Sequence, residues 1–241
     1  MNFIDIHCHI LPDMDDGPAT MEESLRMFDI ALKDGITSVF ATPHIIPGAY
    51  DNTKGSIKAS IQELKKHLPD SIDVFHGADV RVSVDLLKRI EEGEVPTLNN
   101  SAYLLVELPE FIVPPNLDVL FFNLKQKGYT PIITHPERNL RIMRDLGSLF
   151  NLKAAGALTQ LTAMSITGDF GRDIRRTSLA IIESGLADIV ASDAHNEDAR
   201  PPVLSKAYKT VKKEFGDDSA DMFFMKNPKM ILKQAILNSE T

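Results

Sequence analysis

Apolar runs typical of buried strands alternate with helical patterns along the whole chain. Strict alternation of this kind indicates parallel strands joined by right-handed crossover helices. No linker or shift in composition divides the sequence, so we predict one α/β domain over residues 1–241. Helix–strand junctions are predicted at Gly35, Gly128, Gly156 and Gly185. Seven strands are predicted, over 3–6, 36–41, 72–77, 103–106, 131–134, 157–161 and 188–191.

Sequence signals also predict where several helices begin and end. Thr20-Met21-Glu22-Glu23 has the form of a capping box, which predicts a helix from there to Gly35. Further on, one helix is predicted over 140–155 and another over 172–183. Two final helices, over 204–215 and 220–237, are expected to end the fold.

Residues of types that bind metals follow six of the seven predicted strands. In an open doubly wound sheet, strand ends at opposite edges lie too far apart to share one site, whereas in a barrel they converge. The pattern therefore favours a distorted, TIM-like (β/α)7 barrel, with a metal site at the C-terminal ends of its parallel strands. The residues are His7 and His9, His44, Asp79, Glu107, His135, and Asp193 with His195.

The first strand delivers two histidines, separated by Cys8. Side chains alternate along a strand, so His7 and His9 are predicted to share one face and Cys8 to point into the packing behind it. A cysteine phosphatase loop of the Cys-x5-Arg type would need arginine at position 14, which is Met14. A buried thiol is also unreactive, so Cys8 is not predicted to be a nucleophile.

With Asp16 added, the candidate ligands number nine, which is too many for one zinc-like ion with about four ligands. Each residue taken singly could be a loop residue or a helix cap, but together they favour two or three bridged ions. Asp13 and Asp15 are interpreted as turn formers, and His67 and His76 as structural. The candidate metal ligands are His7, His9, Asp16, His44, Asp79, Glu107, His135, Asp193 and His195.

Two arginines follow these candidate ligands on the same rim. Arg138 comes three residues after His135, and Arg200 five residues after His195. Guanidinium groups bind phosphate bidentately, so both are predicted to hold a substrate phosphate. The alternatives are a salt bridge between Arg138 and Glu137, and a plain surface position for Arg200.

Composition excludes several other classes of function. The net charge of −8 gives no broad positive field, so nucleic acid is not expected as a partner. No apolar run reaches the ~18 residues of a membrane span, and no signal peptide is recognised. The single cysteine fits a reducing cytoplasm, which is the expected location. No Gly-x-Gly-x-x-Gly or Gly-x4-Gly-Lys phosphate loop is present.

The ordered motifs resemble the polymerase-and-histidinol-phosphatase (PHP) superfamily, from residue 3 to about 230. The closest branch is the manganese-dependent tyrosine-protein phosphatases of bacterial capsule and exopolysaccharide operons. The resemblance rests on Asp5-Ile6-His7-Cys8-His9, Asp15-Asp16-Gly17, Thr42-Pro43-His44, Gly77-Ala78-Asp79, Glu107, His135-Pro136-Glu137-Arg138 and Ser192-Asp193-Ala194-His195-Asn196.

The resemblance implies a PHP-fold barrel that binds three divalent metals through the nine residues above, with manganese preferred and iron or zinc possible. It implies that Arg138 and Arg200 bind the substrate phosphate, and that the partner is a phosphotyrosine protein, the tail of a bacterial tyrosine autokinase. Two departures stand out: Asp79 replaces the glutamate usual in the family, and Ile45 follows His44 where many relatives carry a second histidine.

The expected activity is hydrolysis of phosphotyrosine by a hydroxide that two metals activate, without a phosphoenzyme. A metal-bound water or Glu137 is the candidate general acid. Two alternatives remain open: a small-molecule phosphatase such as a histidinol-phosphate phosphatase, and a non-catalytic regulatory barrel, which Asp79 favours. An amidohydrolase also begins with His-x-His, but the paired arginines argue against it. The oligomeric state is not predicted.

Overall fold

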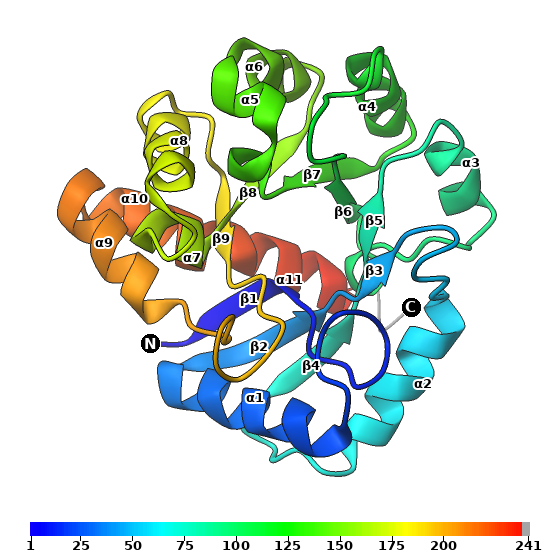
Figure 1. Cartoon of the computed structure of the whole chain (residues 1–241). Coiled ribbons are helices and arrows are strands. Elements are labelled where there is room, and N and C mark those ends of the chain that lie inside the picture. Colours follow the sequence, from blue (N-terminus) through cyan, green and yellow to red (C-terminus); the bar gives the residue numbers. More distant parts are fainter. Residues whose placement is uncertain (238–241) are drawn as a thin grey trace.

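The computed structural model describes residues 1–237, in which all strand pairs are parallel (Figure 1). One sheet has the order β1 (Phe3–Cys8), β2 (Ile36–Ala41), β4 (Asp73–His76). The second has the order β3 (His44–Ile45), β5 (Asp79–Arg81), β6 (Tyr103–Glu107), β7 (Thr130–Thr134), β8 (Leu158–Thr162), β9 (Ile189–Ala191). The predicted parallel α/β class is confirmed. The predicted single domain extends to 238–241, which lie outside the described residues.

Residues 1–237 contain nine strands where seven were predicted, because two short strands, β3 and β5, follow the predicted strands β2 and β4 after a break. Pro43, which has no N–H to donate to a ladder, lies between β2 and β3. Gly77 lies between β4 and β5, where a Cβ would come within 2.7 Å of the Leu98 side chain. Beyond the breaks, β3 and β5 pair with each other, His44 opposite Asp79. The two residues therefore begin short strands of the second sheet rather than follow strands of the first.

The two sheets also adjoin where β1 meets the end of β9. An isolated parallel bridge joins Cys8 and Ala194. The amide of His9 donates to the Ala194 carbonyl and that of Asp193 to the His7 carbonyl, both at 2.9 Å. The carboxylate of Asp5 accepts the Ser192 amide at 3.0 Å and its hydroxyl. Residues 1–237 thus form two sheets with one isolated bridge between them, not one continuous ladder of seven strands.

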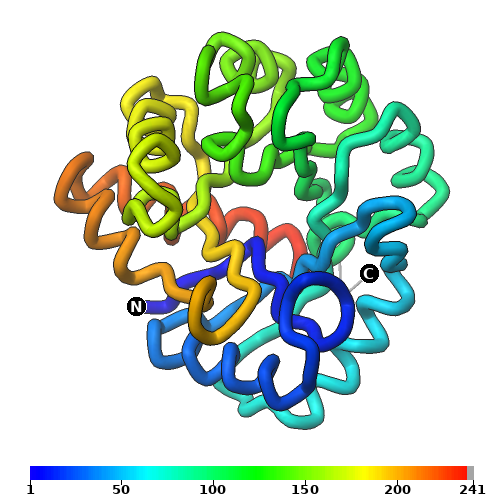
Figure 2. Tube along the Cα trace, in the orientation of Figure 1, coloured from blue at the N-terminus to red at the C-terminus, as the bar shows by residue number. Residues whose placement is uncertain are grey.

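Helices surround the strands on the outside (Figures 1 and 2). No helix within residues 1–237 is long and apolar enough to cross a membrane. The helices are α1 (Met21–Asp34), α2 (Lys54–Lys65), α3 (Leu86–Glu91), α4 (Leu117–Gln126), α5 (Leu140–Arg144), α6 (Gly147–Ala154), α7 (Ala163–Thr167), α8 (Arg172–Glu183), α9 (Ser205–Phe215), α10 (Asp217–Asp221) and α11 (Asn227–Leu237). There are also 3-10 turns, η1 (Leu98–Asn100) and η2 (Pro136–Arg138), and a π-helical turn, η3 (Met222–Lys226).

Two helix predictions had different outcomes. The capping box is confirmed, since the Thr20 hydroxyl accepts the Glu23 amide and the Glu23 carboxylate accepts the Thr20 amide. The single helix predicted over 140–155 is wrong. Asp145 has extended backbone angles that end α5, and its carboxylate accepts the Gly147 amide at the start of α6.

The apolar core divides into an inner and an outer cluster, because side chains alternate along each strand. Ile132 and Ile189 belong to the inner cluster, whereas their neighbours Ile133 and Val190 belong to the outer one, which contacts the surrounding helices. Helix α11 crosses behind the strands (Figure 1) and contributes to the inner cluster. The inner cluster contains Ile4, Ile6, Phe40, Leu98, Leu105, Ile132, Ile189, Ala191, Ile231 and Ala235.

We predict that Ile231→Ala lowers the free energy of unfolding by about 2–5 kcal/mol, because it leaves a cavity in the inner cluster. Ile236 is the matched control, since it lies on the same helix but is 42% exposed, compared with 1% for Ile231. Ile236→Ala is expected to cost less than about 0.5 kcal/mol. Urea denaturation measures both, and equal losses would contradict the role given to α11.

Candidate metal centre

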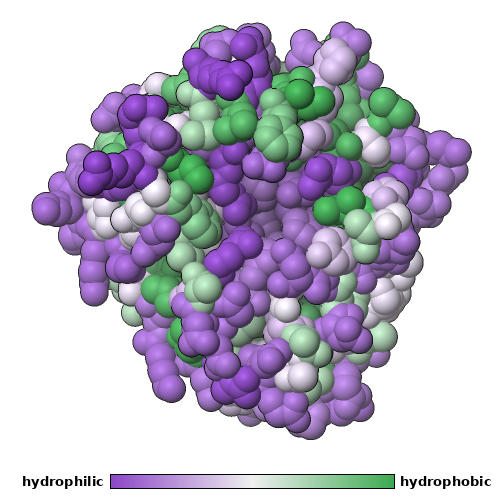
Figure 3. All heavy atoms as spheres, in the orientation of Figure 1, coloured by the Kyte–Doolittle hydropathy of each residue, from purple (hydrophilic) through white to green (hydrophobic). Residues whose placement is uncertain are grey.

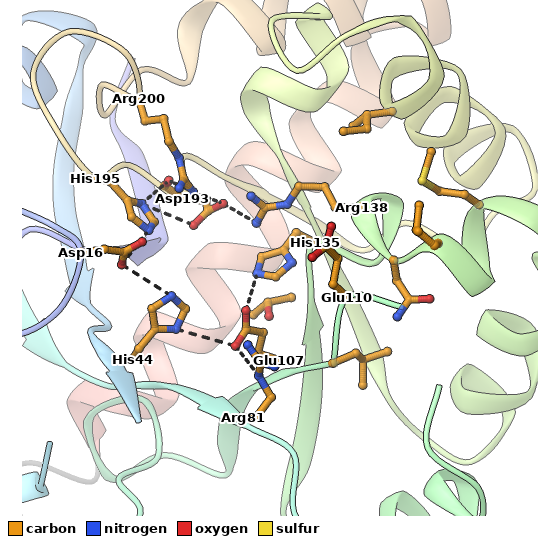
Figure 4. Close-up of a pocket in the computed structure, with 16 residues that line it drawn as sticks. Asp16, His44, Arg81, Glu107, Glu110, His135, Arg138, Asp193, His195 and Arg200 are labelled. Atoms are coloured by element: carbon orange, nitrogen blue, oxygen red, sulfur yellow. Dashed lines mark hydrogen bonds and ion pairs between the residues drawn. The ribbon is translucent and has the colours of Figure 1, made fainter. Parts of the chain in front are cut away.

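The nine candidate ligands converge at the carboxyl ends of the strands. Six of them line a cavity of about 470 Å³: Asp16, His44, Glu107, His135, Asp193 and His195 (Figure 4). Arg138 and Arg200 line the same cavity. The other three candidates, His7, His9 and Asp79, are fully buried. The structure therefore places all of the predicted site residues together.

Asp79 lies at the centre of this cluster. Its Oδ2 is 3.6 Å from His7 Nε2, 3.5 Å from His44 Nδ1 and 3.7 Å from His135 Nε2. Neither Asp79 Oδ2 nor His44 Nδ1 has a hydrogen-bond partner within the described residues, although both atoms are buried. Buried polar atoms without partners are costly. The aspartate, shorter than the family's usual glutamate, still brings its carboxylate oxygen among three imidazoles.

Three overlapping groups of donor atoms could each hold a metal ion. Each pair of groups has one residue in common, which is His9, His44 or Asp79, and the atoms within a group lie within 4.8 Å of one another. His135 lies outside these groups, but its Nε2 is 3.9 Å from Glu107 Oε1. Asp193, also outside, has its Oδ1 3.5 Å from His7 Nε2. The groups are His9, Asp16, His44, His195; His7, His9, Asp79; and His44, Asp79, Glu107.

A bulge in β1 delivers its two histidines to the site. The register of β1 against β2 shifts between Asp5 and Cys8. Before the shift Ile4 and Ile6 pack in the inner cluster, and after it Cys8 packs in the outer one. Cys8 is therefore turned away from the site, as predicted, and burial raises the pKa of its thiol well above the usual value. The bulge itself was not foreseen from strict alternation.

Hydrogen bonds fix the orientation of three histidines. Nδ1 of His7 is 2.8 Å from Gln160 Oε1, Nδ1 of His9 is 2.6 Å from Asp15 Oδ2, and Nδ1 of His195 is 2.9 Å from the Asp193 carbonyl. Because these oxygens are acceptors, each Nδ1 carries the proton and each Nε2 presents a lone pair. The Nε2 atoms of His7 and His9 are 3.0 Å apart. Two facing lone pairs at that distance favour a shared cation.

Asp15 contributes more than the turn predicted for it. Besides binding His9, its carboxylate accepts the amides of His44 and Gly17, each at 2.9 Å.

Gln160 was not predicted as a site residue, because an amide side chain is not a common metal ligand. Arg81 is a third residue that the sequence reasoning missed: it lines the cavity, and its Nε donates to Glu107 Oε2 at 2.8 Å. His67 and His76 lie outside the cavity lining.

Burial sets the ionisation of the cluster. It lowers the pKa of His7 to about 4, and those of His9 and His135 well below their usual value, so these imidazoles are neutral at pH 7 and able to bind metal. Burial, together with the nearby Glu107 charge, raises the pKa of Asp79 well above its usual value. A site with neutral imidazoles and crowded carboxylates has unbalanced negative charge, which divalent cations neutralise.

Asp193 connects the histidines to the arginines. Its Oδ1 faces His7 and His9, whereas its Oδ2 accepts Arg138 Nη2 at 2.5 Å and Arg200 Nη2 at 2.8 Å (Figure 4). Burial alone would raise the pKa of Asp193, but Arg138 and neighbouring cations hold it well below its usual range. The residue is at φ 53°, a backbone conformation that costs of order 1–3 kcal/mol and is typical of functional sites.

Glu137 is not placed to act on a substrate. It is fully buried, its carboxylate accepts the Thr162 amide at 2.9 Å, and it does not line the cavity. Arg138 binds Asp193 rather than Glu137. The interpretation of Glu137 as a general acid is therefore wrong.

The chain matches the model of the family "Capsular polysaccharide synthesis, CpsB/CapC" over residues 3–233. It belongs to this family. It is 37% identical to a putative tyrosine-protein phosphatase CapC of Staphylococcus aureus, over 95% of this chain and 91% of the relative. It is 36% identical to the tyrosine-protein phosphatase YwqE of Bacillus subtilis, over the same shares of the two chains. The resemblance identified from the motifs is confirmed.

A solved structure agrees. A chain from the crystal structures of YwqE from Bacillus subtilis and CpsB from Streptococcus pneumoniae, metal-dependent tyrosine phosphatases, matches with a TM-score of 0.93 and 35% identity. The match covers 96% of this chain and 94% of that chain. A metal-dependent member of the family therefore shares this fold.

We predict that Asp15→Asn weakens Mn²⁺ affinity by about 10- to 100-fold, because the His9 ring loses the carboxylate that orients it. Asp13→Asn is the matched control: Asp13 lies in the same loop, is exposed, and undergoes the same change of charge. Calorimetric titration of metal-stripped protein measures both affinities. If the two variants bind Mn²⁺ equally well, the orienting role of Asp15 is refuted.

Proposed function

We propose that this chain is a metal-dependent phosphatase that hydrolyses phosphotyrosine in a protein and acts in capsular or exopolysaccharide synthesis. One observation carries the proposal: a buried cluster of imidazoles and carboxylates shares a single cavity with two guanidinium groups. The names of the relatives in the family, which are tyrosine-protein phosphatases, supply the substrate class.

We assign the nine candidate ligands to three divalent ions, with manganese preferred and iron or zinc as alternatives. The donor set fits such ions, because imidazole and carboxylate together suit manganese, iron and zinc. The three overlapping donor groups support the number of ions. The unpartnered Asp79 Oδ2 supports a ligand role for this residue.

We infer further that the two sheets form one domain built as a distorted (β/α)7 barrel. Counting β2 with β3 and β4 with β5 gives seven strands in sequential order, two of them interrupted. The bridge between Cys8 and Ala194 supports closure between the last strand and the first.

Bound ions would lower the pKa of a coordinated water and neutralise charge on the phosphoryl group. The chain's own residues supply the rest. Arg138 and Arg200 donate to the phosphoryl oxygens as charge develops on them. Both have a buried Nε–H without a hydrogen-bond partner within residues 1–237. Because Cys8 faces the outer core, transfer goes directly to water, and the products are inorganic phosphate and tyrosine.

The walls of the cavity favour an aryl phosphate. The lining of the cavity includes four apolar side chains, Leu108, Leu140, Met143 and Ile174. An aromatic ring gains free energy by burial against such side chains. Figure 3 shows a hydrophilic hollow at the centre of this face with apolar colour above it.

We propose the tail of a bacterial tyrosine autokinase as the protein substrate, and the cytoplasm as the location. The open face of the cavity in Figure 3 supports access by a side chain on a flexible segment. The single cysteine is consistent with a reducing compartment.

A side-by-side assay tests the proposed function. With Mn²⁺ present, the kcat/KM for a phosphotyrosine peptide is expected to exceed that for histidinol phosphate, and chelation is expected to abolish turnover. His135→Ala is expected to lose a metal ion and nearly all activity. Turnover of histidinol phosphate alone would establish the small-molecule alternative, and metal-loaded protein without any phosphatase activity would establish the regulatory one.

We predict that Arg138→Ala lowers kcat/KM for the phosphopeptide by about 10²- to 10³-fold, the usual cost of removing one donor to the transition state. Metal content should stay unchanged. Arg141→Ala is the control, because Arg141 is exposed and pairs with Asp145 alone. Steady-state kinetics with metal analysis checks both, and indistinguishable kinetics of the two variants would reject the role of Arg138.

A further inference from the structure

An aromatic ring contacts both cavity arginines. The guanidinium carbon of Arg138 is 5.6 Å from the centroid of the Phe170 ring, and that of Arg200 is 5.7 Å from it. Phe170 lies between α7 and α8, far in sequence from η2 and from the loop after β9 that carry the two arginines. It belongs to none of the motifs that point to the metal centre.

The two guanidinium groups present an electrostatic problem, because both donate to one oxygen, Asp193 Oδ2. Two positive charges held this close repel each other. Arg200 Nη2 also donates to the Asp193 carbonyl at 3.1 Å, and the second carboxylate oxygen of Asp193 faces the histidines. A neutral group that attracts both guanidinium groups would hold them together, whereas a further carboxylate beside them would repel a phosphate ester.

The face of an aromatic ring meets this requirement. Its quadrupole attracts a guanidinium within about 6 Å, and it adds no formal charge that would repel phosphate. Arginine also stacks flat on such rings. A stacked guanidinium keeps its N–H groups in one plane, free at the edges to meet phosphoryl oxygens.

The segment that carries Phe170 is held at both sides. Gly168 and Gly171 flank it with φ of 91° and 98°, which other residues rarely adopt. The Asp169 carboxylate accepts the Thr167 hydroxyl and lies 3.6 Å from Lys206 Nζ. On either side of Phe170, the amides of Asp169 and Gly171 donate to the carbonyls of Met164 and Gly168, each at 3.0 Å, so the turn is held by contacts that do not involve the metal centre.

We propose that Phe170 is a positioning residue: its ring holds Arg138 and Arg200 side by side so that both can bind the substrate phosphate. This inference rests on the proposed function and deepens it. Phe170 acts through the two arginines and takes no part in bond making or breaking.

The test compares Phe170→Leu, which removes the π face, with Phe170→Tyr and Phe170→Trp, which keep it. Phe170→Leu is expected to lower kcat/KM for a phosphotyrosine peptide about tenfold, the effect of two contacts of about 0.7 kcal/mol each. It should weaken inhibition by inorganic phosphate in parallel, with metal content unchanged. The Tyr and Trp variants should stay within about twofold of the wild type. Phe150→Leu, at an exposed phenylalanine, is the control.

A second readout separates positioning from a purely structural role. In the Arg138→Ala background one of the two contacts is absent, so Phe170→Leu should have a smaller effect on phosphate inhibition than in the wild type. If Phe170→Leu does not fold, Phe170→Met provides the same comparison.

The outcomes are distinct. A wild-type protein that does not hydrolyse phosphotyrosine refutes the proposed function itself. With an active wild type, the positioning role is overturned by either of two results: Phe170→Leu matching Phe150→Leu, or equal losses in the Leu, Tyr and Trp variants.

Discussion

A buried carboxylate oxygen among imidazole nitrogens is the constraint on which the site depends. Asp79 Oδ2 lies 3.5–3.7 Å from nitrogens of His7, His44 and His135 and has no hydrogen-bond partner within the described part of the chain. Burial of a charge is costly when no opposite charge compensates it, and the neutral imidazoles carry no positive charge. A divalent cation resolves this imbalance, whereas a proton on Asp79 would leave the lone pairs of the histidines unused. The breaks in two strands serve this arrangement, because they place His44 directly opposite Asp79.

Along each strand, apolar side chains and polar side chains lie at different ends. Toward α11 the inner cluster is filled by aliphatic side chains, and at the carboxyl ends the same inward positions hold imidazoles and carboxylates. Asp193 then divides the polar end into two functions, with one oxygen toward the histidines and the other toward the arginines. A single side chain therefore links the candidate metal ligands to the two arginines, whose guanidinium carbons lie 5.6 and 5.7 Å from the centroid of the Phe170 ring.

The residues at strand ends were predictable because parallel strands bring their carboxyl ends together. Histidine and carboxylate residues can also be recognised in a sequence as common metal ligands. The positions of His44 and Asp79 were predicted less well, although Pro43 and Gly77 were signals of the interruptions. Asp15, Gln160 and Phe170 could not be found this way. They act by orienting other side chains, which depends on contacts between distant segments, such as the contact between His7 and Gln160, which lie 153 positions apart. The bulge in β1 was not predicted for a related reason, because the register of a strand depends on its partner strand.

Anomalous diffraction at the manganese edge, from crystals grown with Mn²⁺, tests the central claim most directly. Three peaks are predicted in the cavity, with Asp79 and the other eight candidate residues as their protein ligands. A single peak, or peaks that Asp79 does not contact, would contradict the assignment of this cluster as a three-metal centre.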